Sequence, residues 1–175
     1  MGANLLVSML FRQVPAHTHE LTQRVALAAA DAVATLTGVR PQLKWPNDLL
    51  VDGAKLAGVL AQAGTVDGRI DHVVVGIGVN VGWAPDGGAR VGDDIDPLQL
   101  LASMLTAYDA LPDEVHPRYR EQLATLGQQV RVERAADVVV GQAVDVGRDG
   151  RLVVFDDGGI THHIDTGDVV HLRPA

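Results

Sequence analysis

Residues 44–60, KWPNDLLVDGAKLAGVL, predict a β-hairpin and a functional site around which the rest of the chain is organised. Two short strand-like runs flank Asp52-Gly53, a dipeptide that is a strong signal for a tight β-hairpin turn. Asp67-Gly68, further along the chain, is a second signal of the same kind. A hairpin places both of its ends at one edge of a sheet, so side chains at similar distances from the turn can converge on one pocket. The side chains that we expect there are Lys44, Asn47 and Asp48 on the first run and Lys55 and Gly58 on the second.

The residue types in this stretch suit a polyphosphate ligand. The ammonium groups of Lys44 and Lys55 can offset phosphate charge. The carboxylate of Asp48 can hold Mg²⁺, which prefers oxygen ligands and usually shares the phosphates of its substrate. The hairpin therefore predicts a phosphate and magnesium site.

Composition limits the classes of protein to which the chain can belong. With 175 residues, 47% apolar content and a mean hydropathy of +0.13, it can bury the core of one ordinary domain plus a small appendage. A net charge of -8 argues against sequence-independent binding to nucleic acid, which needs many basic residues. The absence of cysteine excludes disulfides and thiolate chemistry. No apolar run is long enough for a membrane helix and no signal sequence is recognisable, so we expect a cytoplasmic protein.

Residues 4–11, NLLVSMLF, predict a buried strand at the start of the chain. Its polar residues, Asn4 and Ser8, are four apart and share one face of a strand. Two interpretations stay open: the pair lines a polar pocket, or the two side chains bond backbone groups near a strand end.

Residues 72–81, HVVVGIGVNV, predict a strand so rich in valine and isoleucine that both of its faces should be covered. Gly76, Gly78 and Asn80 occupy alternate positions and therefore share one face. A flat ligand could lie against this bare backbone and be bonded by Asn80. Close packing of a helix over the glycines is the alternative, and the sequence leaves both open.

The remaining elements complete an α+β fold. Apolar residues at helical spacing predict one helix from Thr18 to Gly38, a second after Asp96-Pro97, and a short third one over residues 117–126. After Gly127 the period changes, and short alternating strands predict a small barrel. Those strands are expected at residues 130–133, 138–146, 152–155, 160–164 and 169–172. We expect a mixed sheet with helices on one face over residues 1–127, followed by a small β-barrel over residues 128–175.

Three ordered motifs resemble the catalytic domain of biotin protein ligases. They are KWPND at residues 44–48, KLAG at residues 55–58 and GIGVN at residues 76–80. The barrel after Gly127 is similar to the SH3-like C-terminal domain of the same family. The resemblance extends over essentially the whole chain, including GANLLVSM at residues 2–9.

The resemblance implies a ligase that works in two steps with ATP, Mg²⁺ and biotin. The biotin carboxylate attacks the α-phosphate of ATP to give biotinyl-AMP, and a lysine of a biotin carboxyl carrier domain then takes the biotinyl group. Lys55 would contact the biotin carboxylate and the α-phosphate, and Asp48 would help hold Mg²⁺. The other implied positions are Lys44 and Asn47 at the phosphates, Asn80 at the adenylate, and Gly58, Gly76 and Gly78 beside the biotin ring.

The resemblance also implies a difference from full-length members of the family. These carry a strand, a helix and a Gly-Arg-rich loop upstream of the strand that matches residues 4–11, and this sequence begins after that loop. We therefore expect slow or absent adenylation and leakage of the intermediate to water. The alternative function is a catalytically incomplete paralogue that binds biotin or nucleotide. A lipoate-type ligase is disfavoured by KWPND and KLAG. With no helix-turn-helix before the catalytic region we expect no repressor function, and an exposed sheet edge would favour a homodimer.

Overall fold

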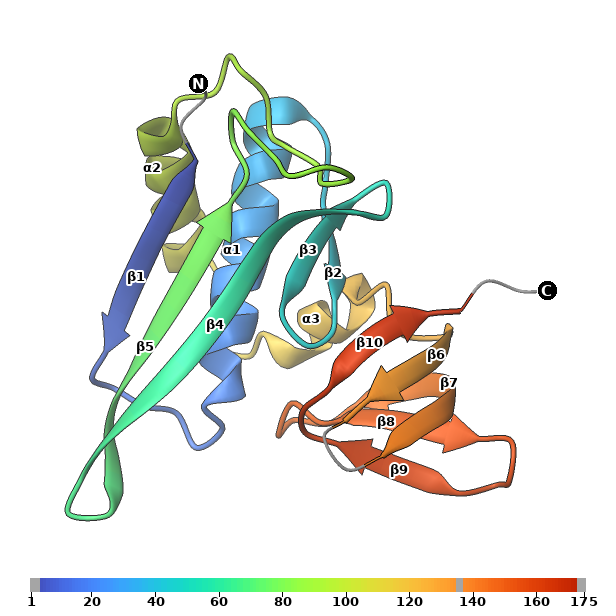
Figure 1. Ribbon diagram of the computed structural model, residues 1–175. Coiled ribbons are helices and arrows are strands. Elements are labelled where there is room, and N and C mark those ends of the chain that lie inside the picture. The colour runs from blue at the N-terminus through green and yellow to red at the C-terminus, as the bar shows by residue number, and fades with distance from the viewer. Residues whose placement is uncertain (1–3, 135–136, 173–175) are drawn as a thin grey trace.

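The computed structural model describes residues 4–134 and 137–172, which form two sheets and three helices (Figure 1). Gly2 and Ala3 of the GANLLVSM stretch lie outside these residues. The strands of the first sheet are β1 (Leu5–Phe11), β2 (Gln42–Lys44), β3 (Asp48–Val51), β4 (Ala54–Val66) and β5 (Arg69–Val79), in the spatial order β1-β5-β4-β3-β2. The helices are α1 (His19–Thr37), α2 (Pro97–Asp109) and α3 (His116–Gln122).

The first sheet is a set of antiparallel neighbours connected by tight turns. Both predicted hairpin turns are confirmed, because Asp52-Gly53 and Asp67-Gly68 each take positive φ at both positions. Lys44 and Asn47 were expected with Asp48 on the first strand of the hairpin, and both placements are wrong, because β3 begins at Asp48 and Asn47 lies in the turn before it. Lys44 ends the separate strand β2 and pairs with Asp48 across the Trp45–Asn47 turn. The parallel component of the predicted mixed sheet is a single bridge between Leu43 and Leu123.

Helices α1 and α2 lie behind the first sheet as it is seen in Figure 1. The alanine-rich face of α1 lies close against the sheet, with Val25, Ala28, Ala29 and Ala32 buried. Burying each large side chain of this layer contributes roughly 1.5–3 kcal/mol. The front face is open, and Leu6 and Leu60 remain 83% and 72% exposed there. The expectation that both faces of β5 are covered is therefore wrong.

The helix ends follow the predicted signals with two differences. Gly38 ends α1 with φ of 75°, and the Asp96 side chain accepts a hydrogen bond from the Leu98 amide at 3.1 Å. Thr18 precedes α1, but its side chain makes no capping hydrogen bond. Helix α3 ends at Gln122, four residues earlier than predicted. None of the helices in residues 4–134 and 137–172 is both long enough and apolar enough to span a membrane.

The second sheet follows Gly127 and has the predicted strands almost to the residue. These are β6 (Gln129–Glu133), β7 (Val138–Val146), β8 (Leu152–Asp156), β9 (Thr161–Ile164) and β10 (Asp168–His171), in the order β10-β6-β7-β8-β9. Strands β9 and β10 are the edges, so this small barrel-like sheet is not closed by hydrogen bonds. The predicted α+β class, with helices on one face of the first sheet and a small β-rich unit after it, is confirmed.

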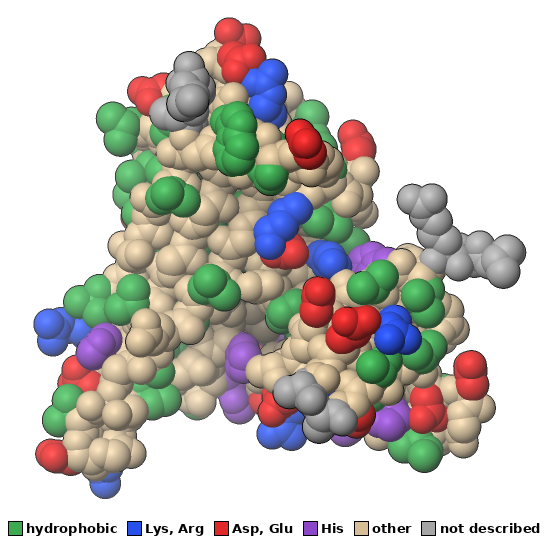
Figure 2. Space-filling model, viewed as in Figure 1, with side chains coloured by type: hydrophobic (Ala, Val, Ile, Leu, Met, Phe, Trp, Pro, Cys, Tyr) green, Lys and Arg blue, Asp and Glu red, His purple; other side chains and the backbone are tan. Residues whose placement is uncertain are grey.

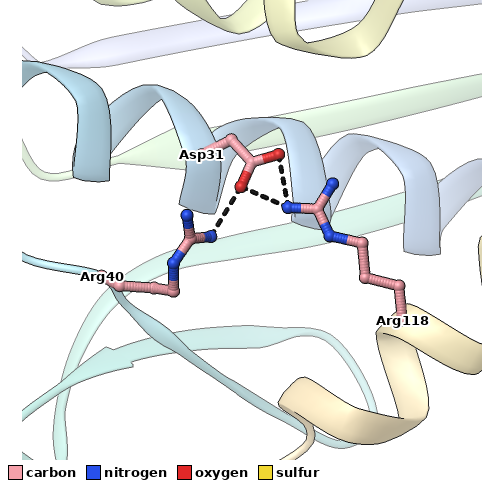
Figure 3. Close-up of polar contacts among 3 residues, drawn as sticks. All are labelled: Asp31, Arg40 and Arg118. Carbon is pink, nitrogen blue, oxygen red and sulfur yellow. Dashed lines mark hydrogen bonds and ion pairs between the residues drawn. The ribbon is translucent and has the colours of Figure 1, made fainter. Parts of the chain in front are cut away.

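A cluster of three charges joins α1 to α3 on the helical side (Figure 3). Arg118 donates from one nitrogen to both carboxylate oxygens of Asp31, at 2.5 and 2.7 Å, and Arg40 donates at 2.6 Å. Burial raises the pKa of Asp31, but the two guanidinium groups outweigh burial, and the pKa lies below its ordinary value. The ionised carboxylate thus fixes α3, and with it the segment that follows, against α1.

Replacing Asp31 by Asn is expected to lower the free energy of unfolding by about 1–3 kcal/mol at pH 7, because hydrogen bonds to charged groups are lost. A carboxyl group whose pKa is lowered by folding stabilises above its ordinary pKa, and this contribution is lost as the pH falls. The deficit of Asp31→Asn should therefore shrink below about pH 4. Urea unfolding at pH 7 and pH 3 measures it, with Asp93→Asn, in the exposed Arg90 pair, as the control. An equal deficit at both pH values would contradict the assignment.

Candidate functional site

One row of residues crosses the whole first sheet on its open face. Register places Leu6 opposite Gly78, Gly78 opposite Gly58, and Gly58 opposite Asp48. Lys44 then pairs with Asp48 at the β2 edge. Two neighbouring strands thus present bare backbone, and the next two present a carboxylate and an ammonium group. The predicted motifs are adjacent in space although up to 34 positions separate their residues.

A register shift between β3 and β4 brings Lys55 to this row. Ala57 lies opposite Leu49 and Lys55 lies opposite Leu50, so Leu56 is the extra residue of a bulge. In a regular strand, residues three apart point to opposite faces. Because of the bulge, Lys55 and Gly58 share the open face. The hairpin pattern alone predicts that these two residues lie together, and no local sequence signal marks the bulge.

Lys55 and Asp48 form an ion pair at the centre of the open face, with Nζ 2.5 Å from Oδ1. The Asp48 side chain is 17% exposed and that of Lys55 is 57% exposed. Oδ1 is buried and, within the described residues, accepts no correctly angled hydrogen bond, so the ammonium group alone offsets its charge. A Cβ atom on Gly58 would lie 3.5 Å from both Cε and Nζ of Lys55. The lysine therefore folds back over Gly58 toward Asp48.

Gly76 and Gly78 keep the neighbouring surface of β5 flat. A Cβ atom on Gly76 would meet Ser8 Oγ at 3.7 Å, and one on Gly78 would meet Leu6 Cδ2 at 3.1 Å. Neither glycine lies beneath a helix, since α1 and α2 cover the opposite face, so the helix-packing alternative is wrong. Hydrophobic side chains surround this surface on the open face (Figure 2). Ser8 is exposed at its edge and available to a ligand.

Two predicted site residues hold the loop that follows β5. Asn4 Oδ1 accepts hydrogen bonds from the Val81 and Trp83 amides at 2.9 and 3.2 Å. Of the two interpretations of Asn4, the structure supports the one in which its side chain bonds backbone groups near a strand end. The Asn80 Nδ2 group donates to the Lys55 and Ala89 carbonyls at 3.2 and 3.0 Å. Asn80 thus ties the loop to β4 beside Lys55, and its amide oxygen remains to meet a ligand.

Sequence reasoning missed a group of residues behind Lys44. The Trp45 amide donates to Thr125 Oγ1 at 3.0 Å, and the indole Nε1 donates to the Gly150 carbonyl at 2.9 Å. His171 of β10 lies 3.3 Å from the same Thr125 oxygen. Burial and the charge of Lys44 hold the pKa of His171 below its ordinary value. The buried Trp45 and Thr125 carried no sequence signal except the aromatic residue inside KWPND.

The residues present suit a Mg²⁺ ion that is held largely by its substrate. No group of three or more His, Asp or Glu side chains suited to a metal ion occurs among residues 4–134 and 137–172. Asp48 is a single carboxylate whose buried oxygen is met by the Lys55 ammonium group within the described residues. One carboxylate together with substrate phosphates is a common way to bind Mg²⁺.

Asn47 lies half-buried in the turn beside Asp48. Its backbone carbonyl accepts a hydrogen bond from the Val59 amide at 2.8 Å.

A cleft of about 660 Å³ elsewhere in the structure is separate from these residues. It lies beside Phe11, Val14, Arg24 and Tyr108, at the opposite end of β1 from Leu6 and Gly78. Apolar side chains and two arginines line it, but it contains none of the predicted site residues. The predicted site residues therefore lie apart from this cleft, and the charged ones lie on the open face of the sheet.

Family comparisons agree with the motifs and with their positions. The biotin/lipoate A/B protein ligase family matches residues 2–80, and the biotin protein ligase C-terminal domain matches residues 125–172. The chain belongs to the biotin protein ligase family. The matched parts include every predicted site residue and the second sheet, respectively.

Individual relatives support the same assignment. The chain is 37% identical to a biotin acetyl-CoA-carboxylase ligase of Mycobacterium tuberculosis, over 87% of this chain and 62% of the relative. It is 29% identical to the ligase of that name from Paracoccus denitrificans, over 80% of this chain and 64% of the relative. It thus spans less than two thirds of the length of either. The fold matches biotin protein ligase from Aquifex aeolicus in complex with biotin and ATP, with a TM-score of 0.78 at 22% identity, over 98% of this chain and 79% of that one.

The environment of His171 predicts a dependence of stability on pH. As the pH falls from 7 to 5, the unfolded chain binds a proton at this histidine before the folded chain does, because folding lowers the pKa. Acidification should therefore destabilise the wild type more than His171→Gln. Urea unfolding at both pH values measures the difference. Equal losses of unfolding free energy in the two proteins would show that His171 titrates as it does in the unfolded chain.

Proposed function

We propose that this chain is an ATP-dependent ligase that attaches biotin to a lysine of a biotin carboxyl carrier domain. The observation that carries the proposal is the row of Gly78, Gly58 and Asp48 on one open face, with Lys55 brought onto it by the bulge. Bare backbone can receive a flat ring, and the charged end can receive phosphates. In the first step the biotin carboxylate attacks the α-phosphorus of ATP and pyrophosphate leaves. In the second, the carrier amine attacks the acyl carbon and AMP leaves.

The roles of the residues follow from their positions on the sheet. Lys55 offsets the charge that develops on the α-phosphate during attack, and its exposed side chain lies on the open face where a ligand can reach it. Lys44 and Asn47 serve the phosphates from the β2 edge. Gly76 and Gly78 give the biotin ring access to the backbone of β5, with Ser8 at the side. The remaining assignments are Gly58 beneath Lys55, and Asn4 and Asn80 holding the loop beside the adenylate.

Asp48 would hold Mg²⁺ together with the phosphates of ATP. The bound ion would supply positive charge to the phosphate oxygens. Within the chain, Asp48 also fixes the direction of Lys55, because the buried Oδ1 draws the ammonium group across Gly58. Holding Lys55 in place before substrate arrives reduces the freedom that must be lost at the reaction.

The wider setting is also part of the proposal. We assign residues 1–127 to the catalytic domain and residues 128–175 to the SH3-like C-terminal domain. The use of ATP and of a carrier protein favours a cytoplasmic location and needs no nucleic acid. Strand β1 is an apolar edge of the sheet, which favours a homodimer paired through it. Sedimentation velocity showing only monomer at high concentration would exclude that dimer.

Transfer of labelled biotin to a carrier domain, with ATP and Mg²⁺, tests the ligase function. Lys55→Ala should lower adenylate formation by at least about 100-fold, because one preorganised charge is lost at the transition state. The variant should stay folded but lose about 1–3 kcal/mol of unfolding free energy, because the buried Asp48 Oδ1 loses the ammonium group beside it. Lys55 and Lys44 are the only lysines of the chain, so mass spectrometry separates carrier labelling from self-labelling unambiguously.

Gly76→Ala provides the reciprocal variant. Its new Cβ makes only ordinary contacts, so the fold should persist while biotin affinity falls about tenfold or more. Lys55→Ala should keep most of the biotin affinity. Gln62→Ala, at the far end of β4, is the control and should change neither biotin affinity nor adenylate formation. Full carrier labelling by Lys55→Ala would contradict the site.

One observation favours the alternative of a binding module without turnover. Leu6 and Leu60 stay largely exposed, and no described segment covers Gly76 and Gly78 from the front. Catalysis by acyl transfer needs water to be kept from the reactive intermediate. Biotin binding by isothermal titration calorimetry, with neither pyrophosphate exchange nor carrier labelling, would establish this alternative for the 175-residue chain.

A further inference from the structure

Trp45 joins the turn of the predicted phosphate site to the second sheet. It is buried and stands between Lys44, which ends β2, and Asp48, which begins β3. Both of its hydrogen-bond donors point away from the first sheet. The backbone N–H bonds Thr125, and the indole N–H bonds the carbonyl of Gly150 in the β7–β8 turn. The turn that carries Lys44 and Asp48 is therefore anchored outside its own sheet.

Thr125 is the centre of the anchor. It is fully buried in the segment between α3 and β6, and this segment also runs along β2, where the Ala124 amide donates to the Leu43 carbonyl at 2.8 Å. Thr125 Oγ1 accepts from the Trp45 amide, so its own proton is free to go to His171 Nε2, 3.3 Å away. A single hydroxyl group thus connects the turn to β10.

His171 completes the connection next to a residue of the site. It lies on the inward face of β10, together with the buried Val169. Burial, together with the charge of Lys44, lowers the pKa of His171. Through Thr125, β10 of the second sheet thus reaches the turn that follows Lys44.

The β7–β8 turn is fixed against the first part of the chain at several points. Gly150 has φ of +82°, and a Cβ atom there would lie 2.5 Å from Cγ of His19, so the turn packs directly on the start of α1. Arg120 of α3 pairs with Asp145 of β7 at 2.6 Å, and Arg148 pairs with Glu114. These contacts hold the Gly150 carbonyl in place as an acceptor for Trp45.

We propose that Trp45, Thr125 and His171 are positioning residues through which the second sheet sets the location of Lys44 and Asp48. The inference rests on the proposed ligase function for its consequence in catalysis, but the coupling itself is a property of the fold. Loosening the anchor moves the phosphate end of the row and leaves the glycine end on β5 untouched. A displacement of about 1 Å at a catalytic group costs up to roughly 100-fold in rate.

Paired variants test the coupling while keeping the fold. Gly150→Ala introduces the clash with His19, whereas Gly159→Ala has the same φ of +82° in the β8–β9 turn and meets nothing within 4 Å. Thr125→Val removes the shared hydroxyl, and Thr125→Ser restores it. Trp45→Phe removes the indole donor alone. Thermal unfolding confirms that each variant is folded before it is assayed.

The variants are expected to impair the use of ATP without weakening the binding of biotin. Gly150→Ala and Thr125→Val should lower kcat/KM for ATP by about 10- to 100-fold in biotin-dependent pyrophosphate exchange, with the Kd for biotin within twofold. Thr125→Ser and Gly159→Ala should stay near the wild type. Unchanged ATP kinetics in folded Thr125→Val and Gly150→Ala would overturn the proposal, and so would an equal loss in Gly159→Ala.

A second measurement is independent of catalysis, so it separates failure of this inference from failure of the proposed function. Because the chain has two lysines, labelling with [15N]lysine gives two backbone amide signals, which Lys55→Arg assigns. Thr125→Val and Gly150→Ala should shift the Lys44 signal and leave that of Lys55 in place, even if the wild type proves inactive. An unmoved Lys44 signal in both variants would overturn the coupling.

Discussion

The bulge between β3 and β4 is the constraint on which the candidate site depends. Alternation along a regular strand would send Lys55 to the helical face, where the buried core has no place for a charge. The one extra residue, Leu56, returns Lys55 to the open face and leaves Leu56 in the core. Asp48 then meets Lys55 across Gly58, which has no side chain to separate them. The Lys55–Asp48 ion pair therefore depends on both the bulge at Leu56 and the missing side chain of Gly58.

One face of the first sheet packs against helices, and the other is the proposed ligand-binding face. The second sheet supports the charged end of the ligand-binding face. Alanines of α1 are buried and pack closely on the helical face. The front face remains free for a ligand, with apolar and bare positions at β1 and β5 and charged ones at β2 to β4. The charged end lies where the sheet is narrowest, since β2 has three residues. There the buried hydrogen bonds of Trp45 to Thr125 and Gly150 provide the support that further strand pairing would give.

Much of this architecture could be predicted from the sequence, because local signals govern it. Asp52-Gly53 and Asp67-Gly68 fixed both hairpins, Gly38 and Asp96 fixed helix ends, and alternation placed the strands of the second sheet. Local patterns could not show that Lys44 belongs to its own strand or that β5 is open on one face. They also could not reveal the bulge or the role of Thr125, because both depend on partners far away in the sequence. Asn4 and Asn80 were found, but their hydrogen bonds to the loop after β5 depend on tertiary contacts.

In the proposed ligase, biotin and the adenylate lie on the open face, between the glycines of β5 and the Lys55–Asp48 pair. A crystal structure of this chain with a non-hydrolysable analogue of biotinyl-AMP would show where they bind. We expect the ring system to lie against Gly76 and Gly78 and the phosphate to lie within hydrogen-bond distance of Lys55 Nζ. An analogue bound in the cleft beside Phe11 and Tyr108, with the open face unchanged, would refute this binding site.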